Sequence, residues 1–228
     1  MSLSTHCASN LRQLGTAFFT YAAENNGQLP PGYANPGIPS QTMGERVWYQ
    51  YLMFHDVRLY KGDGVLPNPN WSWSPGDGGN QKDVLTIYNC PANPYRLGRW
   101  ETPSYAYSRG FGTFGDANGY PFNPTRLAAI EQPSQTILLV DAGERYLNGQ
   151  SPQNGPPMSL CYISGYNDST FYWQRSVNFD VHGGRANFLF VDGHVETLNH
   201  SEVQERGSLS PPTLLWSRGN ASSGSAFW

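Results

Sequence analysis

The segment from His182 to Leu198 reads His-Gly-Gly-Arg-Ala-Asn-Phe-Leu-Phe-Val-Asp-Gly-His-Val-Glu-Thr-Leu. It holds a hydrophobic run from Ala186 to Val191, the pair Asp192-Gly193, and a second run from His194 to Leu198. Asp-Gly between two such runs is the strongest short-range signal for a β-hairpin with a two-residue turn, in which both turn residues have positive φ. We therefore predict a hairpin with Asp192 and Gly193 at its turn.

A further strand is predicted just before this hairpin. Val177, Phe179 and Val181 alternate with polar residues, as in a half-buried strand, and Gly183-Gly184 then turns the chain. Together these segments predict a three-stranded antiparallel meander over residues 176–199. Other apolar runs bounded by prolines predict short strands at Val84–Tyr88, Tyr105–Ser108 and Thr136–Val140, with a helical turn near Thr125–Ile130.

The beginning of the chain has the pattern of an amphipathic helix. Between Ser9 and Asn26, Leu11, Leu14 and Phe18 recur at helical spacing. The apolar stripe also takes in the cysteine at position 7, so we expect the helix to occupy residues 7–26. Asn-Asn-Gly at 25–27 tolerates a left-handed turn, and the two prolines at 30–31 forbid continuation. A second, shorter helix is expected at Glu45–Phe54.

The composition is typical of an irregular α+β protein. The 228 residues are 38% hydrophobic and only 14% charged, with 25 glycines and 18 prolines, which fits neither a disordered chain nor a helical bundle. This length allows one domain, residues 1–228, with a hydrophobic core. The formal net charge is −3 and the chain has no block of basic residues, so nucleic acid is not an expected partner.

Two separated segments resemble one bacterial family. The first, Cys7–Gly15 with the residues that follow it up to Leu29-Pro30, resembles the region just after the membrane anchor of prepilin-like proteins with an N-terminal cleavage/methylation signal. In the second, His182 is followed after nine residues by Asp192-Gly193, which is similar to the H-x9-DG signature of that group. Three further stretches resemble its intermediate landmarks: Cys90-Pro91, Ser104-Tyr105, and Pro133–Thr136 leading to Asp141.

The resemblance implies a pilin-like fold, in which an N-terminal helix packs on an antiparallel β-sheet with long irregular loops. It also implies a non-enzymatic, pseudopilin-like subunit of a type II secretion or type IV pilus-like assembly. The implied partners are other pilin-like subunits and the secretion apparatus, in the bacterial periplasm or at the cell surface. An apolar helix that precedes this chain would anchor it in the inner membrane, and residues 1–3 are interpreted as a remnant of cloning.

The chain has three cysteines, Cys7, Cys90 and Cys161, which cannot all pair within one molecule. One reading is three buried free thiols. An exported location would permit one disulfide, for which Cys7–Cys90 is the first choice. No two cysteines have the Cys-x-x-Cys spacing, so the sequence gives little support for zinc or redox chemistry.

His182, Asp192 and His194 are residue types that bind zinc and related ions. An extended strand rises about 3.3 Å per residue, so a strand between His182 and Asp192 would separate them by roughly 30 Å. We therefore expect structural roles: Asp192 and Gly193 form the turn, and His182 hydrogen-bonds to a neighbouring loop. No catalytic residue is predicted, because the chain also lacks a Gly-x-Ser-x-Gly nucleophile elbow.

Two alternatives involve loops. Asp116 and Asn118 lie in an oxygen-rich, glycine-rich stretch that makes them candidate calcium ligands, as do residues 77–83, although neither stretch completes an EF-hand. No cofactor is otherwise expected. The alternative function is a surface-anchored, glycan-binding module, in which exposed tryptophans stack on sugar rings, although Trp more often packs in a core. The candidate tryptophans are Trp48, Trp71, Trp73, Trp100 and Trp173.

Overall fold

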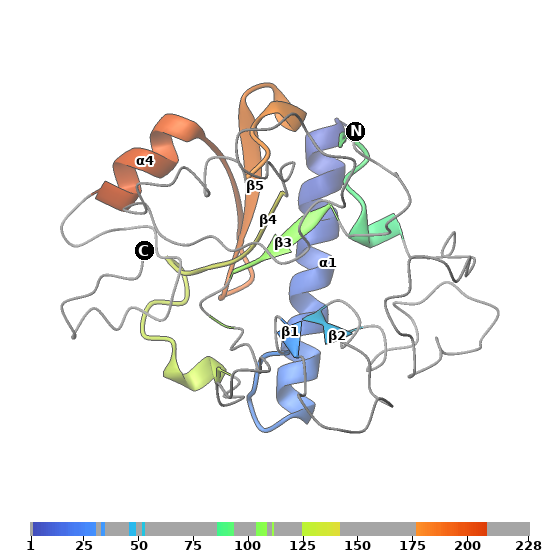
Figure 1. Cartoon of the computed structure of the whole chain (residues 1–228), viewed down its shortest axis with the longest axis vertical. Helices are drawn as coiled ribbons and strands as arrows, with labels where there is room; N and C mark the ends of the chain where they lie inside the picture. Colours follow the sequence, from blue (N-terminus) through green and yellow to red (C-terminus); the bar gives the residue numbers. More distant parts are fainter. Residues whose placement is uncertain are drawn as a thin grey trace.

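The computed structural model describes residues 2–30, 33–34, 46–48, 52, 86–93, 104–108, 111, 125–141 and 177–208. Within these ranges an N-terminal helix lies beside a four-stranded antiparallel sheet, and a second helix follows the last strand (Figure 1). The fold is therefore α+β. None of the helices described is long and apolar enough to cross a membrane.

Helix α1 (Leu3–Glu24) begins earlier than predicted because Ser2 caps it: the Ser2 side chain accepts a hydrogen bond from the Thr5 backbone N–H at 3.2 Å. The helix ends where the sequence indicates. Asn26 and Gly27 both have positive φ, at 55° and 76°, and the Gly27 N–H donates to the Ala22 carbonyl at 2.7 Å. This arrangement is the left-handed C-terminal cap that such residues favour.

The sheet has the order β3 (Tyr105–Tyr107), β4 (Ile137–Asp141), β5 (Arg185–Phe190) and β6 (Val195–Asn199), with every neighbouring pair antiparallel. The predicted strands at Tyr105–Ser108 and Thr136–Val140, and the hairpin after them, correspond to these four. The predicted strand at residues 177–181 is wrong, because β4 occupies the place beside β5.

The residues of that predicted strand instead lead into a 3₁₀ helix, η6 (Asp180–His182). The cause is a local turn: the Asn178 side-chain oxygen accepts a hydrogen bond from the Asp180 backbone N–H at 3.2 Å. Asn residues often start turns through such a bond, which competes with strand pairing.

Two other expectations are corrected. In the predicted strand Val84–Tyr88, Thr86–Tyr88 is a 3₁₀ helix, η3, and the residue after it is held by α1, since Asn10 donates to the Asn89 carbonyl at 3.0 Å. In the predicted helix Glu45–Phe54, Arg46–Val47 is strand β2, paired with β1 (Tyr33–Ala34). Among the described residues of that segment, Trp48 and Leu52 have helical backbone; residues 45, 49–51, 53 and 54 lie outside the description. The helical turn expected near residues 125–130 is present as η5 (Leu127–Ala129).

The hairpin turn between β5 and β6 has three residues rather than two. Phe190 and His194 form the last pair, since the Phe190 N–H donates to the His194 carbonyl at 2.9 Å, and the Gly193 N–H returns to the Phe190 carbonyl at 3.0 Å. Gly193 has φ 93°, whereas Asp192 does not have positive φ. The Asp192 carboxylate instead accepts from the His194 backbone N–H at 3.1 Å. This is the three-residue loop with glycine in the left-handed position.

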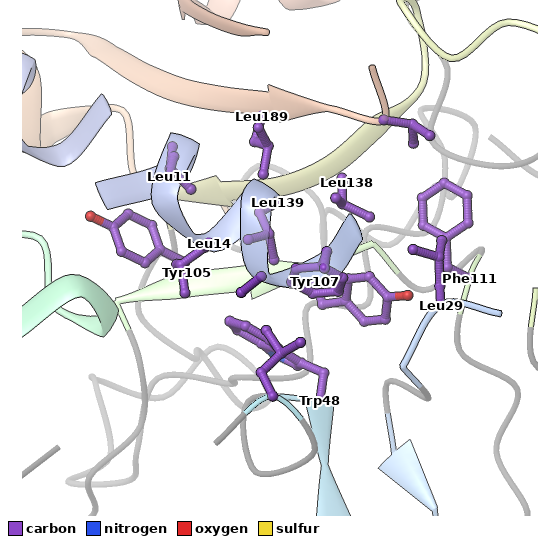
Figure 2. Close-up of a cluster of buried hydrophobic side chains, with 14 of the residues drawn as sticks. Leu11, Leu14, Leu29, Trp48, Tyr105, Tyr107, Phe111, Leu138, Leu139 and Leu189 are labelled. Atoms are coloured by element: carbon purple, nitrogen blue, oxygen red, sulfur yellow. The ribbon is translucent and has the colours of Figure 1, made fainter. Parts of the chain in front are cut away.

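The core lies on both faces of the sheet, as alternation along the strands requires. Leu139 and Leu189 point toward α1, where they pack with Leu11, Leu14 and the aromatic residues around Trp48 (Figure 2). The opposite face packs in a second cluster with Val203 of α4 (His200–Ser208): Ala106, Ile137, Val140, Val177, Ala186, Phe188, Phe190 and Leu198. Each face of the sheet is therefore buried against a helix.

Candidate functional site

Four residues that carry the family resemblance meet at one end of the sheet. Cys7 belongs to α1, Cys90 follows η3, Asp141 ends β4 and His182 ends η6 just before β5. In an antiparallel sheet the end of one strand lies beside the start of the next, and Asp141 accordingly pairs with the first residue of β3, Tyr105. The topology thus gathers side chains that are far apart in sequence.

Cys7 and Cys90 are joined by a disulfide across 83 residues, with their Cα atoms 5.0 Å apart. This is the pair that the sequence analysis put first. Both residues are buried, and the bond attaches the first turns of α1 to the segment after η3. Cys161 lies outside the described residues.

His182 faces this disulfide and the carboxylate of Asp141 at the same time. Its Nε2 atom is 3.2 Å from Asp141 Oδ2 and 3.6 Å from Cys90 Sγ. Only 2% of each of the His182 and Asp141 side-chain surfaces is exposed. A proton on Nε2 lets the imidazole donate to the carboxylate, so His182 Nε2 and Asp141 Oδ2 satisfy one another away from water.

Asp141 joins three segments of the chain. The Asn187 backbone N–H in β5 donates to Asp141 Oδ2 at 2.7 Å, and the Asp141 carbonyl accepts from the Asn178 backbone N–H at 3.0 Å. Burial raises the pKa of Asp141, while the hydrogen bonds from His182 and Asn187 act in the opposite direction. Its Oδ1 atom is buried and has no hydrogen-bond partner within the described ranges. The carboxylate therefore retains an acceptor that the described structure leaves unused.

Asp192 and His194 lie elsewhere, at the far end of β5 from His182. Their side chains form a pair, with His194 Nδ1 2.5 Å from Asp192 Oδ1, and His194 Nε2 is 3.1 Å from Glu196 Oε1. The His194 ring stacks on Phe190 at a centroid distance of 4.2 Å. His182 and Asp192 thus have different partners, and the signature residues serve two separate structural features.

The candidate calcium ligands Asp116 and Asn118 lie outside the described residues, as do four of the five tryptophans considered for glycan binding. The fifth, Trp48, is fully buried and stacks on Phe18 with ring centroids 5.5 Å apart. It belongs to the core and offers no face to a sugar.

The contact between His182 and Asp141 is the feature that sequence reasoning missed. Asp141 attracted notice only as a landmark at the end of an apolar run, and no spacing rule connects residues 41 positions apart. The local sequence held one hint of this contact: Asp141 directly follows four aliphatic residues. A carboxylate that is buried with such a strand must find a partner or become neutral.

The cluster can act chemically in two ways. In the oxidised protein, the disulfide and the His182–Asp141 pair hold α1, β4, β5 and η6 together. The ligand atoms of Cys7, Cys90 and His182 lie within 4.8 Å of one another, so the same residues also have the spacing of a metal site. The sulfurs of a disulfide are not thiolates, and thiolate is the form that binds metal.

Comparison of the chain with protein-family models, curated proteins and solved structures found no match.

Proposed function

We propose that this chain is a non-enzymatic, pseudopilin-like structural subunit of a type II secretion or type IV pilus-like assembly. The observation that carries the proposal is the position of α1. The helix lies along one face of the antiparallel sheet, with Leu11, Leu14 and Phe18 buried, while Arg12, Gln13 and Thr16 on its other side are exposed. A helix held in this way can contact neighbouring subunits through its outer face.

The roles of the signature residues support a structural function. His182 is buried against Asp141 and Cys90, where a substrate in solution does not reach it. Gly193 forms the hairpin turn, and a Cβ atom there would be 3.1 Å from the Phe19 ring of α1. Both ends of the signature therefore help to set the packing of the helix and the sheet.

The disulfide supports the proposed location. Disulfides persist in the bacterial periplasm and at cell surfaces and are rare in a reducing cytosol. Cys7 and Cys90 are paired in this structure. We propose a periplasmic or surface-facing domain, whose inner-membrane anchor is the upstream apolar helix that the resemblance implies.

Photocrosslinking in the native bacterium tests the assembly. A photoreactive amino acid at Gln13, on the exposed face of α1, should give adducts between this protein and pilin-like subunits. Ser201 is the matched control position, because it is exposed on α4, which lies apart from α1 across the sheet (Figure 1). Adducts from neither position, or adducts with enzymes of polysaccharide metabolism, would contradict the proposal.

A further inference from the structure

A carboxylate lies next to the group of two cysteines and one histidine at the end of the sheet. His182 Nε2 is 3.6 Å from Cys90 Sγ and 3.2 Å from Asp141 Oδ2, so one nitrogen faces a sulfur and a carboxylate oxygen together. Cys7 Sγ lies within 4.8 Å of the Cys90 and His182 ligand atoms. Two thiolates, an imidazole and a carboxylate are all recognised ligands of Zn²⁺.

Two of the six edges of a tetrahedral zinc site can be compared directly with distances in the structure. Zinc binds sulfur at about 2.3 Å, imidazole nitrogen at about 2.0 Å and carboxylate oxygen at about 2.1 Å. Tetrahedral angles then place sulfur and nitrogen about 3.5 Å apart, and nitrogen and oxygen about 3.4 Å apart. The observed separations are 3.6 Å from Cys90 Sγ to His182 Nε2 and 3.2 Å from that nitrogen to Asp141 Oδ2. These two edges need almost no rearrangement. The two sulfurs are bonded to each other in this structure and must separate to about 3.8 Å after reduction. Asp141 lies outside the group whose ligand atoms are all within 4.8 Å of one another, so its carboxylate must also move toward the sulfurs.

We propose that Cys7, Cys90, His182 and Asp141 form a tetrahedral site for Zn²⁺, or a similar thiolate-binding divalent ion, when the two cysteines are reduced. The disulfide and the metal are mutually exclusive states of one site. This inference concerns the isolated domain and does not depend on the proposed assembly.

Asp141 is a direct ligand in this site rather than an outer partner of the histidine. A carboxylate that only orients a metal-binding imidazole contacts the ring nitrogen that does not bind the metal. Here Asp141 and Cys90 both approach Nε2, the nitrogen that faces the sulfurs. The Asn187 N–H orients the carboxylate through its bond to Oδ2, and the buried Oδ1 remains available.

The change of state balances as two steps. A dithiol reductant gives two electrons and two protons to the disulfide, which yields two thiols and an oxidised reductant. Zn²⁺ then displaces the two thiol protons, which are released to water. The proton on His182 Nε2 moves through water to Nδ1, so that a neutral imidazole binds the ion through Nε2 and Asp141 binds it as a carboxylate. Because Cys7 and Cys90 are buried, we expect the ion to enter while the reduced chain folds.

The test is zinc binding by the purified chain in two redox states. The chain is refolded with Zn²⁺ under reducing, oxygen-free conditions, desalted and analysed for metal, alongside oxidised chain treated in the same way. We expect about one tightly held equivalent in the reduced sample only. X-ray absorption at the zinc edge, which needs no variant, should show two sulfurs at about 2.3 Å and two nitrogen or oxygen ligands near 2.0 Å.

Variants then identify the two remaining ligands. His182→Ala and Asp141→Asn should each weaken zinc binding by at least about 100-fold, because loss of even an outer-shell partner costs about 10- to 100-fold. His194→Ala is the matched control: this histidine also lies between carboxylates, but at the far end of β5. It should bind zinc like the parent. Each variant is first checked for folding in the oxidised state, where His182→Gln replaces His182→Ala if the alanine variant does not fold.

Four results would overturn the proposal. In the first, the reduced chain retains no zinc after desalting. In the second, the oxidised chain retains as much zinc as the reduced one. In the third, zinc binding needs the cysteines but is unchanged by the His182 or Asp141 substitution. In the fourth, the absorption spectrum lacks the nitrogen and oxygen ligands. The third or the fourth result would mean that the two thiols alone hold the ion.

Discussion

Gly193 in the hairpin turn lies directly against Phe19 of α1: a Cβ atom built on Gly193 would be 3.1 Å from Phe19 Cε2. The glycine also has φ 93°, in the region that side chains disfavour. One residue thus serves both the turn and the contact between the helix and the sheet.

Gly193→Ala should lower the free energy of unfolding by about 2 kcal/mol, because it adds left-handed strain to a steric contact. Gly193→Val should lower it further, since a β-branched residue tolerates positive φ poorly. The matched control is Gly184→Ala, which has φ 84° but open space around its Cβ position. Urea denaturation should show a smaller loss for the control. Equal losses at the two sites would mean that the Phe19 contact adds nothing.

The packing of α1 predicts a large effect at Leu14, whose side chain is fully buried against the sheet (Figure 2). Leu14→Asp would bury an unpaired charge and should lower the free energy of unfolding by about 3 kcal/mol or more. The neighbouring Gln13 is exposed, so Gln13→Asp should change stability by about 0.5 kcal/mol or less. Thermal denaturation of both variants decides this: a Leu14→Asp protein that melts like the parent contradicts the burial of this face.

The sequence predicted those parts of the fold that local patterns determine. The helical stripe of Leu11, Leu14 and Phe18 indicated α1 and its buried face, and Asp192-Gly193 indicated the hairpin. These signals are local. Residues three or four positions apart share one face of a helix, and a glycine favours a tight turn, whatever the rest of the fold is.

The parts that the sequence did not predict depend on distant partners. Val177–Val181 has the alternation of a strand, but the place beside β5 is taken by β4, and Asn178 begins a turn instead. The site was missed for the same reason, because His182 lies just before β5 and meets Asp141 of β4 only when these two strands pair. Even the turn differed by one residue, because the Asp192 side chain bonds to the His194 backbone.

The disulfide should contribute much of the stability of the oxidised chain. Closing a loop of 83 residues restricts the unfolded state, which the chain-entropy model values at about 4.5 kcal/mol. We expect the Cys7→Ser, Cys90→Ser double variant to lose about 2–4 kcal/mol in metal-free buffer. Cys161→Ser, which replaces a cysteine outside this bond, is the control for the loss of a thiol alone. Equal melting of the double variant and the parent would show that this bond does not form in solution.

Glu196 on β6 should make stability depend on pH. Burial alone would raise its pKa, but the hydrogen bonds from Arg206 and His194 outweigh that effect and hold the pKa below the ordinary value of 4.5. A carboxylate with a lowered folded pKa stabilises the protein above its unfolded pKa, and this contribution is lost as the pH falls through the folded value. Because the side chain is partly exposed, we expect no more than about 1 kcal/mol.

Glu196→Gln should therefore be less stable than the parent at pH 7, and the difference should shrink as the pH falls from about 4.5 to about 3. Urea denaturation at a series of pH values measures the difference directly, and Glu131→Gln, on an exposed turn, is the control that should follow the parent throughout. The Arg206 guanidinium also lies over the Phe190 ring at 6.0 Å, so Arg206→Lys tests the geometry of the pair with the charge kept. A constant difference between Glu196→Gln and the parent from pH 7 to pH 3 would mean that Glu196 contributes through packing rather than through its charge.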